Sequence, residues 1–402
     1  MTSPGAASPE PGTPPGRASR SEERRRVASL AAVITAAFGV GLAFGIGFPL
    51  TSLTLEAWAT PKWLIGIAGA APSMGVLAAL PFLPRFVARW GAVRAITLGC
   101  LAGAAGFMAL GLFQDVYAWI AIRFLMSAGL ALPWLAGETW INMVTREETR
   151  GRVIAIYAIS FFTGYTVGPL LLDVTGFAGL APYVAGAASM AFAGLPIVLA
   201  SRLAPDVSEN GSSHSPFSAV RLAPVGMMGG FIGGFAEMSY LALIGNVGLA
   251  GGLDQATALR LMSFMTAGGV ALQFLIGYLA DKVARTHVTA ALAVAFIALS
   301  LLLPAGLANP PWAFPLAFVL GGVVLGFYTV GLAVVGEEVE ARDLAAANAA
   351  FLVMYQLGAI LGPAAAGVAM SVSPVAGFVN AMALAMTLAL AALLWLAGRS
   401  RR

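Results

Sequence analysis

Charged side chains are scarce in this chain. Asp, Glu, Lys and Arg make up 10% of its 402 residues, whereas about a quarter of a soluble globular protein is charged. Hydrophobic residues account for 59% of the chain, and its mean hydropathy is +0.87. Because a water-soluble core cannot bury so much apolar surface, lipid must be the solvent. The composition therefore excludes a soluble globular fold and predicts an integral membrane protein.

Cysteine and histidine are nearly absent as well. The single cysteine, Cys100, has no second thiol in the chain with which to form a disulfide bond. The two histidines, His214 and His287, belong to no His-Glu-x-x-His or Cys/His pattern, so no zinc site is predicted. A Gly-x-x-x-x-Gly-Lys-Ser/Thr motif is also missing, so the chain is not expected to hydrolyse ATP. We expect no metal and no cofactor.

Long apolar runs are abundant. They are about 20 residues long, which is the length that a helix with a rise of 1.5 Å per residue needs to cross about 30 Å of hydrocarbon. The short alternating segments of a β-barrel are not seen. The predicted fold is an all-α integral membrane protein with twelve transmembrane helices, at 28–53, 60–83, 92–112, 116–141, 151–172, 177–200, 222–247, 256–280, 287–307, 312–335, 344–370 and 374–397.

Basic residues are distributed unevenly along these segments. With a cytoplasmic start, all of the 22 Lys and Arg residues except Lys62, Arg123 and Arg260 fall in cytoplasmic segments. This asymmetry follows the positive-inside rule, so both termini are predicted to be cytoplasmic. The net charge of +4 is therefore a topology signal, and no nucleic-acid partner is expected. Arg-over-Lys and Ala-rich usage is typical of a GC-rich bacterial genome, which suggests the bacterial inner membrane.

Polar stretches divide the chain. Residues 1–26 are rich in Pro, Gly, Ser and Arg and are predicted to form a disordered cytoplasmic tail. The longest internal polar stretch, 202–221, is predicted to be a flexible cytoplasmic linker. It separates a first half at 27–201 from a second half at 222–397, each with six helices, and residues 398–402 form a basic cytoplasmic C-terminus.

The two halves share a short sequence motif, which we call the repeated phrase. GYTVGP at 164–169 and GAILGP at 358–363 both read Gly-x-x-x-Gly-Pro, in the fifth and the eleventh predicted helix. Small residues four apart let two helices approach closely, and proline bends a helix. Helix packing alone explains either copy, but the repeat favours a flexing seam between two rocking halves. The residues expected to act in this conformational change are Gly164, Gly168, Pro169, Gly358, Gly362 and Pro363.

Three further motifs identify a family. RFLMSAGLA at 123–131 resembles the fourth-helix motif of the major facilitator superfamily, and GYLADK at 277–282 resembles its loop motif. ETWIN at 138–142, followed by RGR at 150–152, is similar to the YcaD-like bacterial branch. With the twelve segments and the repeat, the resemblance extends over about 28–397. It implies a secondary transporter whose two halves rock around a central site.

The same loop motif is incomplete after the second helix. Arg89 and Gly91 match it, but Ala88 replaces its Asp, so an ion network anchored there is doubtful in the first half. Asp281 and Lys282 keep the motif in the second half. By this resemblance, Arg89, Gly91, Asp281 and Lys282 are candidate gating residues.

One acidic residue stands near the middle of an apolar segment. A charged side chain at the bilayer centre costs about 2.5–3.5 kcal/mol on insertion scales, so Glu237, within 222–247, requires a reason. The family resemblance places its helix beside the central cavity. A carboxyl group withdrawn from water binds a proton more readily, so Glu237 is predicted to couple transport to protons or to bind a cation. The alternative is a structural role, with Glu237 paired to Arg or hydrogen-bonded.

Two more charged residues lie in the segment 116–141. Arg123 is predicted either to act in proton coupling and cavity electrostatics, as the resemblance implies, or to extend its side chain to the membrane interface. Glu138 lies at the cytoplasmic end, where a helix-end salt bridge or an inner gate is favoured over substrate binding.

Neutral polar side chains complete the candidate cavity. They are Trp134, Tyr240, Asn246 and Tyr328, with Tyr240 preferred because it lies one helical turn from Glu237. Hydrogen bonds between helices explain any one of them equally well.

The sequence as a whole predicts a monomeric secondary transporter that moves a small organic solute by alternating access, with protons as the coupling ion. An enzyme is not expected, because a polytopic membrane enzyme should show a clustered nucleophile, histidine or metal set. It remains an alternative, as does a transporter-like membrane sensor, although a sensor should carry a large soluble signalling domain.

Overall fold

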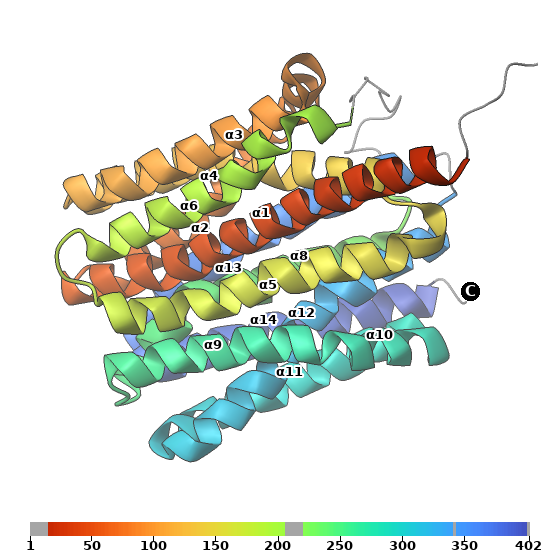
Figure 1. Cartoon of the computed structure of the whole chain (residues 1–402). Coiled ribbons are helices and arrows are strands. Elements are labelled where there is room, and N and C mark those ends of the chain that lie inside the picture. The colour runs from red at the N-terminus through yellow and green to blue at the C-terminus, as the bar shows by residue number, and fades with distance from the viewer. Residues whose placement is uncertain (1–14, 206–219, 341–342, 400–402) are drawn as a thin grey trace, which may run out of the picture.

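The computed structural model describes residues 15–205, 220–340 and 343–399, and this part of the chain is helical, with no β-strand. Twelve of its helical segments are long and apolar enough to cross a membrane, which confirms the predicted fold class. The helices, drawn in Figure 1, are α1 (Pro15–Ala57), α2 (Lys62–Ala79), α3 (Leu83–Leu112), α4 (Val116–Val144), α5 (Arg150–Thr175), α6 (Ala181–Leu199), α8 (Pro224–Ala250), α9 (Gln255–Ala271), α10 (Gln273–Lys282), α11 (Arg285–Ala308), α12 (Pro310–Glu338), α13 (Leu344–Val372) and α14 (Pro374–Arg399).

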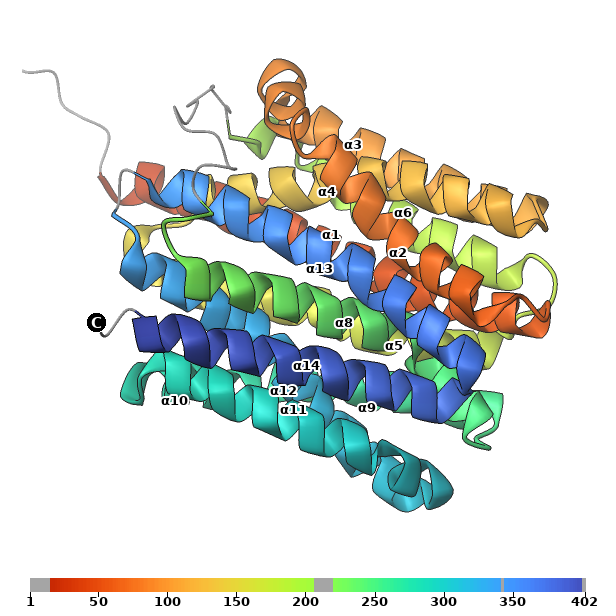
Figure 2. The same ribbon diagram turned by 180° about the vertical axis from the view of Figure 1, so that it is seen from behind.

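The helices run side by side as one bundle with two ends. We call the end where α1 begins and α14 finishes the near end, and the end where α1 finishes, at Ala57, the far end. The near end lies on the right in Figure 1 and on the left in Figure 2. Helices α9 and α10 together make a single span, Gln255–Lys282.

The helices pack in two sets. In the first set α1 packs against α5 and α6, α3 against α4 and α6, and α2 against α4. In the second set α8 packs against α13, α9 against α12, and α11 against α12 and α14. The two sets meet where α2 packs against α13 and α5 against α9. Figures 1 and 2 show α3 and α11 at opposite sides of the molecule, with α5, α8 and α13 between them.

The repeated Gly-x-x-x-Gly-Pro phrases occupy equivalent helix crossings. A Cβ atom added to Gly164 would lie 2.2 Å from the carbonyl oxygen of Phe38, so α5 touches the backbone of α1 there. A Cβ atom added to Gly358 would lie 2.0 Å from the carbonyl oxygen of Phe231, so α13 touches the backbone of α8. Each phrase thus joins two helices of its own set, as close small-residue contacts do in membranes.

At Pro363 the second phrase, on α13, also contacts α2 of the other set of helices. A Cβ atom on Gly66 of α2 would lie 2.3 Å from the carbonyl oxygen of Pro363, and one on Gly367 would lie 2.6 Å from the carbonyl oxygen of Lys62. The end of α13 that lies at the far end therefore makes backbone contact with α2. The predicted conformational role of both phrases remains a prediction.

Gly91 turns the chain between α2 and the main part of α3. Its backbone has φ 77° and ψ 160°, a conformation open almost only to glycine. Glycine is therefore required here for a structural reason: the short helical segment before Gly91 and the membrane span after it run in different directions. Arg89 beside it is exposed.

The structure corrects one predicted boundary. The tail was expected to be disordered as far as residue 26, but α1 begins at Pro15. The stretch SEERRR is rich in good helix formers, and Glu23 pairs with Arg26 at 2.5 Å and with Arg146, which lies between α4 and α5, at 2.9 Å. The rest of the predicted tail, most of the predicted linker and the last three residues lie outside the described residues.

Candidate functional site

Arg123 lies two turns into α4 and is only 4% exposed. Its Nη1 donates to the carbonyl oxygen of Gly47 at 3.0 Å and to Thr51 Oγ1 at 2.6 Å. Its Nε donates to the carbonyl oxygen of Ala68 at 3.3 Å. That oxygen has no helical donor, because Pro72, four residues later, lacks an N–H group. The guanidinium therefore lies inside the bundle, hydrogen-bonded to α1 and α2. Its side chain does not extend to the membrane interface, which was the alternative.

Glu237 lies in the middle of α8 and is half-buried. Its Oε2 accepts a hydrogen bond from the Tyr355 hydroxyl of α13 at 2.8 Å. In the described part of the chain no Lys, Arg or His nitrogen lies within salt-bridge distance of Glu237. The Tyr355 ring packs edge-to-face on Tyr328, with centroids 5.3 Å apart. The structure thus brings together two predicted residues, Glu237 and Tyr328, through a third.

Trp134 and Glu138 form a second polar pair, one turn apart on α4. Trp134 Nε1 donates to Glu138 Oε1 at 2.8 Å, and both side chains are exposed. The Trp134 ring packs against Phe161 of α5 at 5.7 Å. The Tyr328 hydroxyl interacts electrostatically with both Glu138 and Glu237. Tyr328 of α12 is therefore within electrostatic range of both carboxylates.

Tyr165 of α5 is a neighbour of both charged positions. It is 7% exposed, and its hydroxyl has no hydrogen-bond partner among the described residues. It interacts electrostatically with both Glu237 and Arg123. Its ring lies 6.3 Å from that of Phe48 and 6.3 Å from that of Phe161. Arg123 and Glu237, which come from different sets, thus share this neighbour.

Tyr240 does not join this group. It is fully buried, its hydroxyl lies 2.8 Å from Ser300 Oγ of α11, and its ring packs between Phe296 and Phe378. One helical turn brings it close to Glu237 along α8, but its ring points into the interior of the second set. Tyr355 takes the position beside Glu237 that the sequence assigned to Tyr240.

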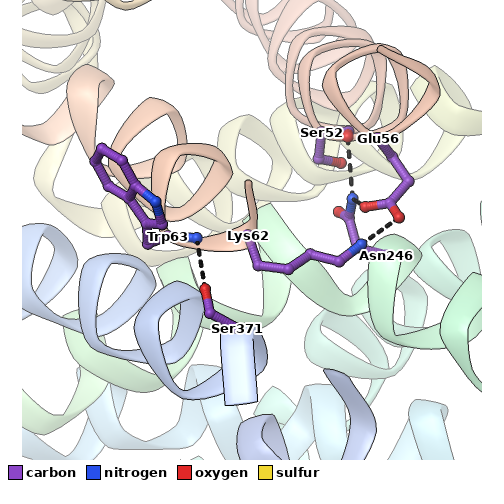
Figure 3. A network of polar contacts seen from close by, with 6 residues as sticks. All are labelled: Ser52, Glu56, Lys62, Trp63, Asn246 and Ser371. Atoms are coloured by element: carbon purple, nitrogen blue, oxygen red, sulfur yellow. Dashed lines mark hydrogen bonds and ion pairs between the residues drawn. The ribbon is translucent and has the colours of Figure 1, made fainter. Parts of the chain in front are cut away.

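Asn246 lies at the far end and joins the two sets (Figure 3). Its Nδ2 donates to the carbonyl oxygen of Ser52 at 3.0 Å and to Glu56 Oε2 at 2.9 Å, both on α1. Lys62, at the start of α2, pairs with the other Glu56 oxygen. We call Ser52, Glu56, Lys62 and Asn246 the far-end network. The predicted cavity residue Asn246 is thus part of a contact between sets.

Two further contacts close the far end. The Trp63 amide of α2 donates to Ser371 Oγ of α13 at 3.2 Å, beside the far-end network in Figure 3. Arg260 of α9 donates to Asp173 Oδ2 of α5 at 3.1 Å. Both link the helices at which the sets meet, so the far end is held by polar contacts as well as by backbone packing.

The predicted gating residues of the second loop motif lie at the near end. Asp281 and Lys282 are exposed, and Lys282 Nζ lies 5.9 Å from the Tyr278 ring. Next to them Arg285 pairs with Glu337 at 3.2 Å, which joins α11 to α12 within one set. No group of three or more His, Cys, Asp or Glu able to hold a metal ion occurs among the residues the structure describes.

Sequence reasoning gave too little weight to several residues of this site. Tyr355 is absent from the candidates above, although it comes three residues before the second Gly-x-x-x-Gly-Pro phrase, and Tyr165 lies within the first phrase. Glu56 and Lys62 flank a short loop, where a charge pair is a recognisable signal. Their importance depends on contacts across the bundle.

Twelve membrane-length helices in two packed sets define a multi-pass membrane protein. The sequence model of the Major Facilitator Superfamily matches residues 33–286 and 226–402, so the chain belongs to that superfamily. It is 29% identical to the uncharacterized MFS-type transporter YcaD of Salmonella enteritidis over 335 residues, which cover 82% of this chain and 85% of YcaD.

Solved structures have the same fold. The nucleoside transporter NupG superposes with a TM-score of 0.75 at 15% identity, covering 91% of this chain and 98% of that one. A bacterial homologue of the human lysosomal transporter Spinster, in an inward-facing and occupied conformation, superposes with a TM-score of 0.71 at 16% identity, covering 96% and 98%. These structures show the fold, and the superfamily match together with the relatives, which are named as transporters, supports a secondary transporter.

Proposed function

We propose that this protein moves a small organic solute by alternating access and couples the movement to protons through Glu237. The observation that carries the proposal is the hydrogen bond from Tyr355 to Glu237 in the middle of α8, with no basic partner for the carboxylate among the described residues. A charge at this depth is expensive unless it is paired or functional. A proton-carrying carboxyl group meets that requirement.

A carboxyl group can carry a proton because its protonated form is neutral. The neutral form can pass through a closed apolar seam that an unpaired carboxylate would cross only at high cost. Tyr355 can donate to the carboxylate and can also accept from the carboxylic acid, since a phenol does both. The pair therefore keeps a hydrogen bond in either protonation state.

The far end of the bundle supports an orientation for this structure. We propose that the near end is cytoplasmic, because the basic residues concentrate there, and that the protein resides in the bacterial inner membrane. The contacts at Asn246, Arg260 and Trp63 hold the far end, while Trp134 and Glu138 are exposed toward the near end. On this proposal the structure is closed to the outside. The proposed functional unit is a monomer, since the candidate site lies within one chain.

The test is solute-dependent proton movement. The purified protein is reconstituted in liposomes that contain the pH dye pyranine, and a panel of metabolites and drugs is added under an imposed solute gradient. At least one solute should change the internal pH with the wild type, and Glu237→Gln should transport the same solute without proton movement. Glu148→Gln, which changes an exposed carboxylate between α4 and α5, is the matched control and should behave as the wild type.

The outcomes separate the competing functions. Unchanged proton-coupled flux in Glu237→Gln would remove Glu237 from the mechanism. Chemical conversion of a lipid or solute would favour a membrane enzyme. Saturable binding without flux of any bound solute would favour a sensor.

A further inference from the structure

Arg123 is a buried positive charge without a negative partner. It is 4% exposed, and no described carboxylate lies within 4.0 Å of its guanidinium. Its hydrogen-bond acceptors are two backbone carbonyl oxygens and one hydroxyl. These dipoles lower the cost of burying the charge but leave it un-neutralised, which is unusual for a charged group at membrane depth.

The guanidinium keeps part of its donor capacity. Arginine has five N–H donors, and in Arg123 the Nε group and both N–H groups of Nη1 are engaged. In the described part of the chain no oxygen accepts from Nη2. The two N–H groups of Nη2 point in different directions, so each can donate one charge-assisted hydrogen bond, and one of them suffices to hold a carboxylate oxygen.

An unpaired hydroxyl lies beside the guanidinium. Ser52 is 4% exposed, and its Oγ has no hydrogen-bond partner among the described residues. Ser52 and Arg123 line the same narrow cavity, which is too small for a water molecule in this structure, together with Phe48 of α1, Ile65 of α2 and Ala242 of α8. An unsatisfied buried hydroxyl costs about 1–3 kcal/mol. A bound group with acceptor oxygens would satisfy both this hydroxyl and the free N–H groups of Arg123. The cavity also lies at the seam between the two sets of helices.

Aromatic rings lead from this cavity toward the exposed pair on α4. Phe48 lies under the guanidinium at 5.3 Å, and the ring centroids of Phe48 and Phe44 are 6.4 Å apart. Phe44 continues to Phe161 at 6.0 Å, and Phe161 continues to Trp134 at 5.7 Å. A ligand anchored at Arg123 would therefore place its body along an apolar, aromatic wall.

In this structure the space at Arg123 is small. A second cavity at the guanidinium, lined by Phe44, Phe48 and Ser127, has a volume of about 20 Å³, which is enough for one water-sized group. The body of a solute requires the two sets to separate, and the cavity lies where that separation would open it.

We propose that Arg123 and Ser52 bind the carboxylate of the transported solute, and that the substrates are small monocarboxylic acids with an apolar or aromatic body. This inference rests on the proposed transport function and names its substrate class. The competing explanation is that Arg123 only holds α1, α2 and α4 together.

Ser52→Ala separates the two explanations. The hydroxyl has no partner, so its loss should not weaken the fold, whereas it should weaken carboxylate binding by about 10- to 100-fold, the value of one hydrogen bond to a charged group. Ser263→Ala is the matched control, because Ser263 is also 4% exposed with an unpaired Oγ but lies on α9, outside the Arg123 cavities.

The experiment is a thermal-shift titration of the full-length protein in detergent at constant ionic strength. Sodium acetate, sodium benzoate and sodium phenylacetate are compared with benzamide and with sodium chloride. A ligand that binds only the folded state raises Tm saturably. We expect a saturable rise with benzoate or phenylacetate for the wild type and Ser263→Ala, and a rise displaced to at least about tenfold higher concentration for Ser52→Ala.

Three results would overturn the inference. They are equal titrations for Ser52→Ala and Ser263→Ala, an equal response to benzamide and benzoate, and an equal response to chloride, which would assign the site to an inorganic anion. The proposed function fails separately. If a neutral solute shows proton-coupled flux and no carboxylate binds, the proposed transport function stands and the carboxylate site at Arg123 is wrong. If a carboxylate binds but no solute is transported, the site stands and the proposed transport function is wrong.

Discussion

Replacing Gly358 by alanine tests whether α8 and α13 are joined by direct backbone contact. The added Cβ atom would lie 2.0 Å from the carbonyl oxygen of Phe231 and 2.8 Å from the backbone nitrogen of Phe235. Real Cβ atoms essentially never come closer than 3.0 Å to such atoms, so the two helices must move apart by about 1 Å. Because the obstacle is backbone, no side-chain rotation can relieve it.

The magnitude follows from two opposing effects. Overpacking a tight contact costs about 1–3 kcal/mol, whereas alanine in place of glycine within a helix contributes about 0.8–1.0 kcal/mol of stability. We therefore expect Gly358→Ala to lose up to about 2 kcal/mol of unfolding free energy. The matched control is Gly277→Ala in α10, where an added Cβ atom meets nothing within 4 Å. The control should be as stable as the wild type or more stable.

The assay is thermal unfolding of both variants in one detergent, followed by tryptophan fluorescence. Gly358→Ala should unfold at a lower temperature than both the wild type and Gly277→Ala. If the two variants unfold at the same temperature, the crossing of α8 and α13 does not depend on the missing side chain, and the packing argument for the repeated phrase fails.

Two further predictions concern the far end. Asn246→Leu removes both hydrogen bonds between the sets at this position, and the loss of about 1.5–3 kcal/mol should favour opening by roughly 10- to 100-fold. Because the far end then opens more often, a cysteine introduced by Thr54→Cys, in a Cys100→Ala background, should react faster with a maleimide. An unchanged rate would show that the Asn246 hydrogen bonds do not hold the far end closed. Asp254 caps α9, and hydrogen bonds from the Thr257 amide and hydroxyl lower its pKa. Its stabilising contribution is therefore fully present above the pKa it has when unfolded and is lost as the pH falls through the lowered folded value. Asp254→Ala should flatten the acid limb of a plot of Tm against pH, and an unaltered limb would contradict this.

The spans and the family were predictable from local properties. Hydropathy and a rise of 1.5 Å per residue determine which segments can cross a membrane, so all twelve spans were expected. The loop motif marked Gly91 as a candidate gating residue; the structure shows its positive φ, and the gating role stays a prediction. The helical start at Pro15 was missed, because a Pro- and Ser-rich composition was given more weight than the helix-forming SEERRR stretch.

The candidate site was predictable only in part. Glu237 and Arg123 were found because charge is rare within apolar segments. Tyr240 was preferred over Tyr355 because it is a near neighbour on the same helix, whereas Tyr355 lies 118 residues from Glu237 in sequence. The contact between Asn246 and Glu56 spans 190 residues, and no local pattern indicates it.

By itself the sequence determined that the chain lies in lipid, how many times it can cross, and which few residues carry charge there. These properties depend on composition and helix rise, which are local to each segment. Only the tertiary structure decided which polar groups meet: Tyr355 with Glu237, Thr51 and two backbone carbonyls with Arg123, and Asn246 with α1 at the far end. Such pairs form where helices distant in sequence cross, and each crossing is determined by the shapes of both packed surfaces.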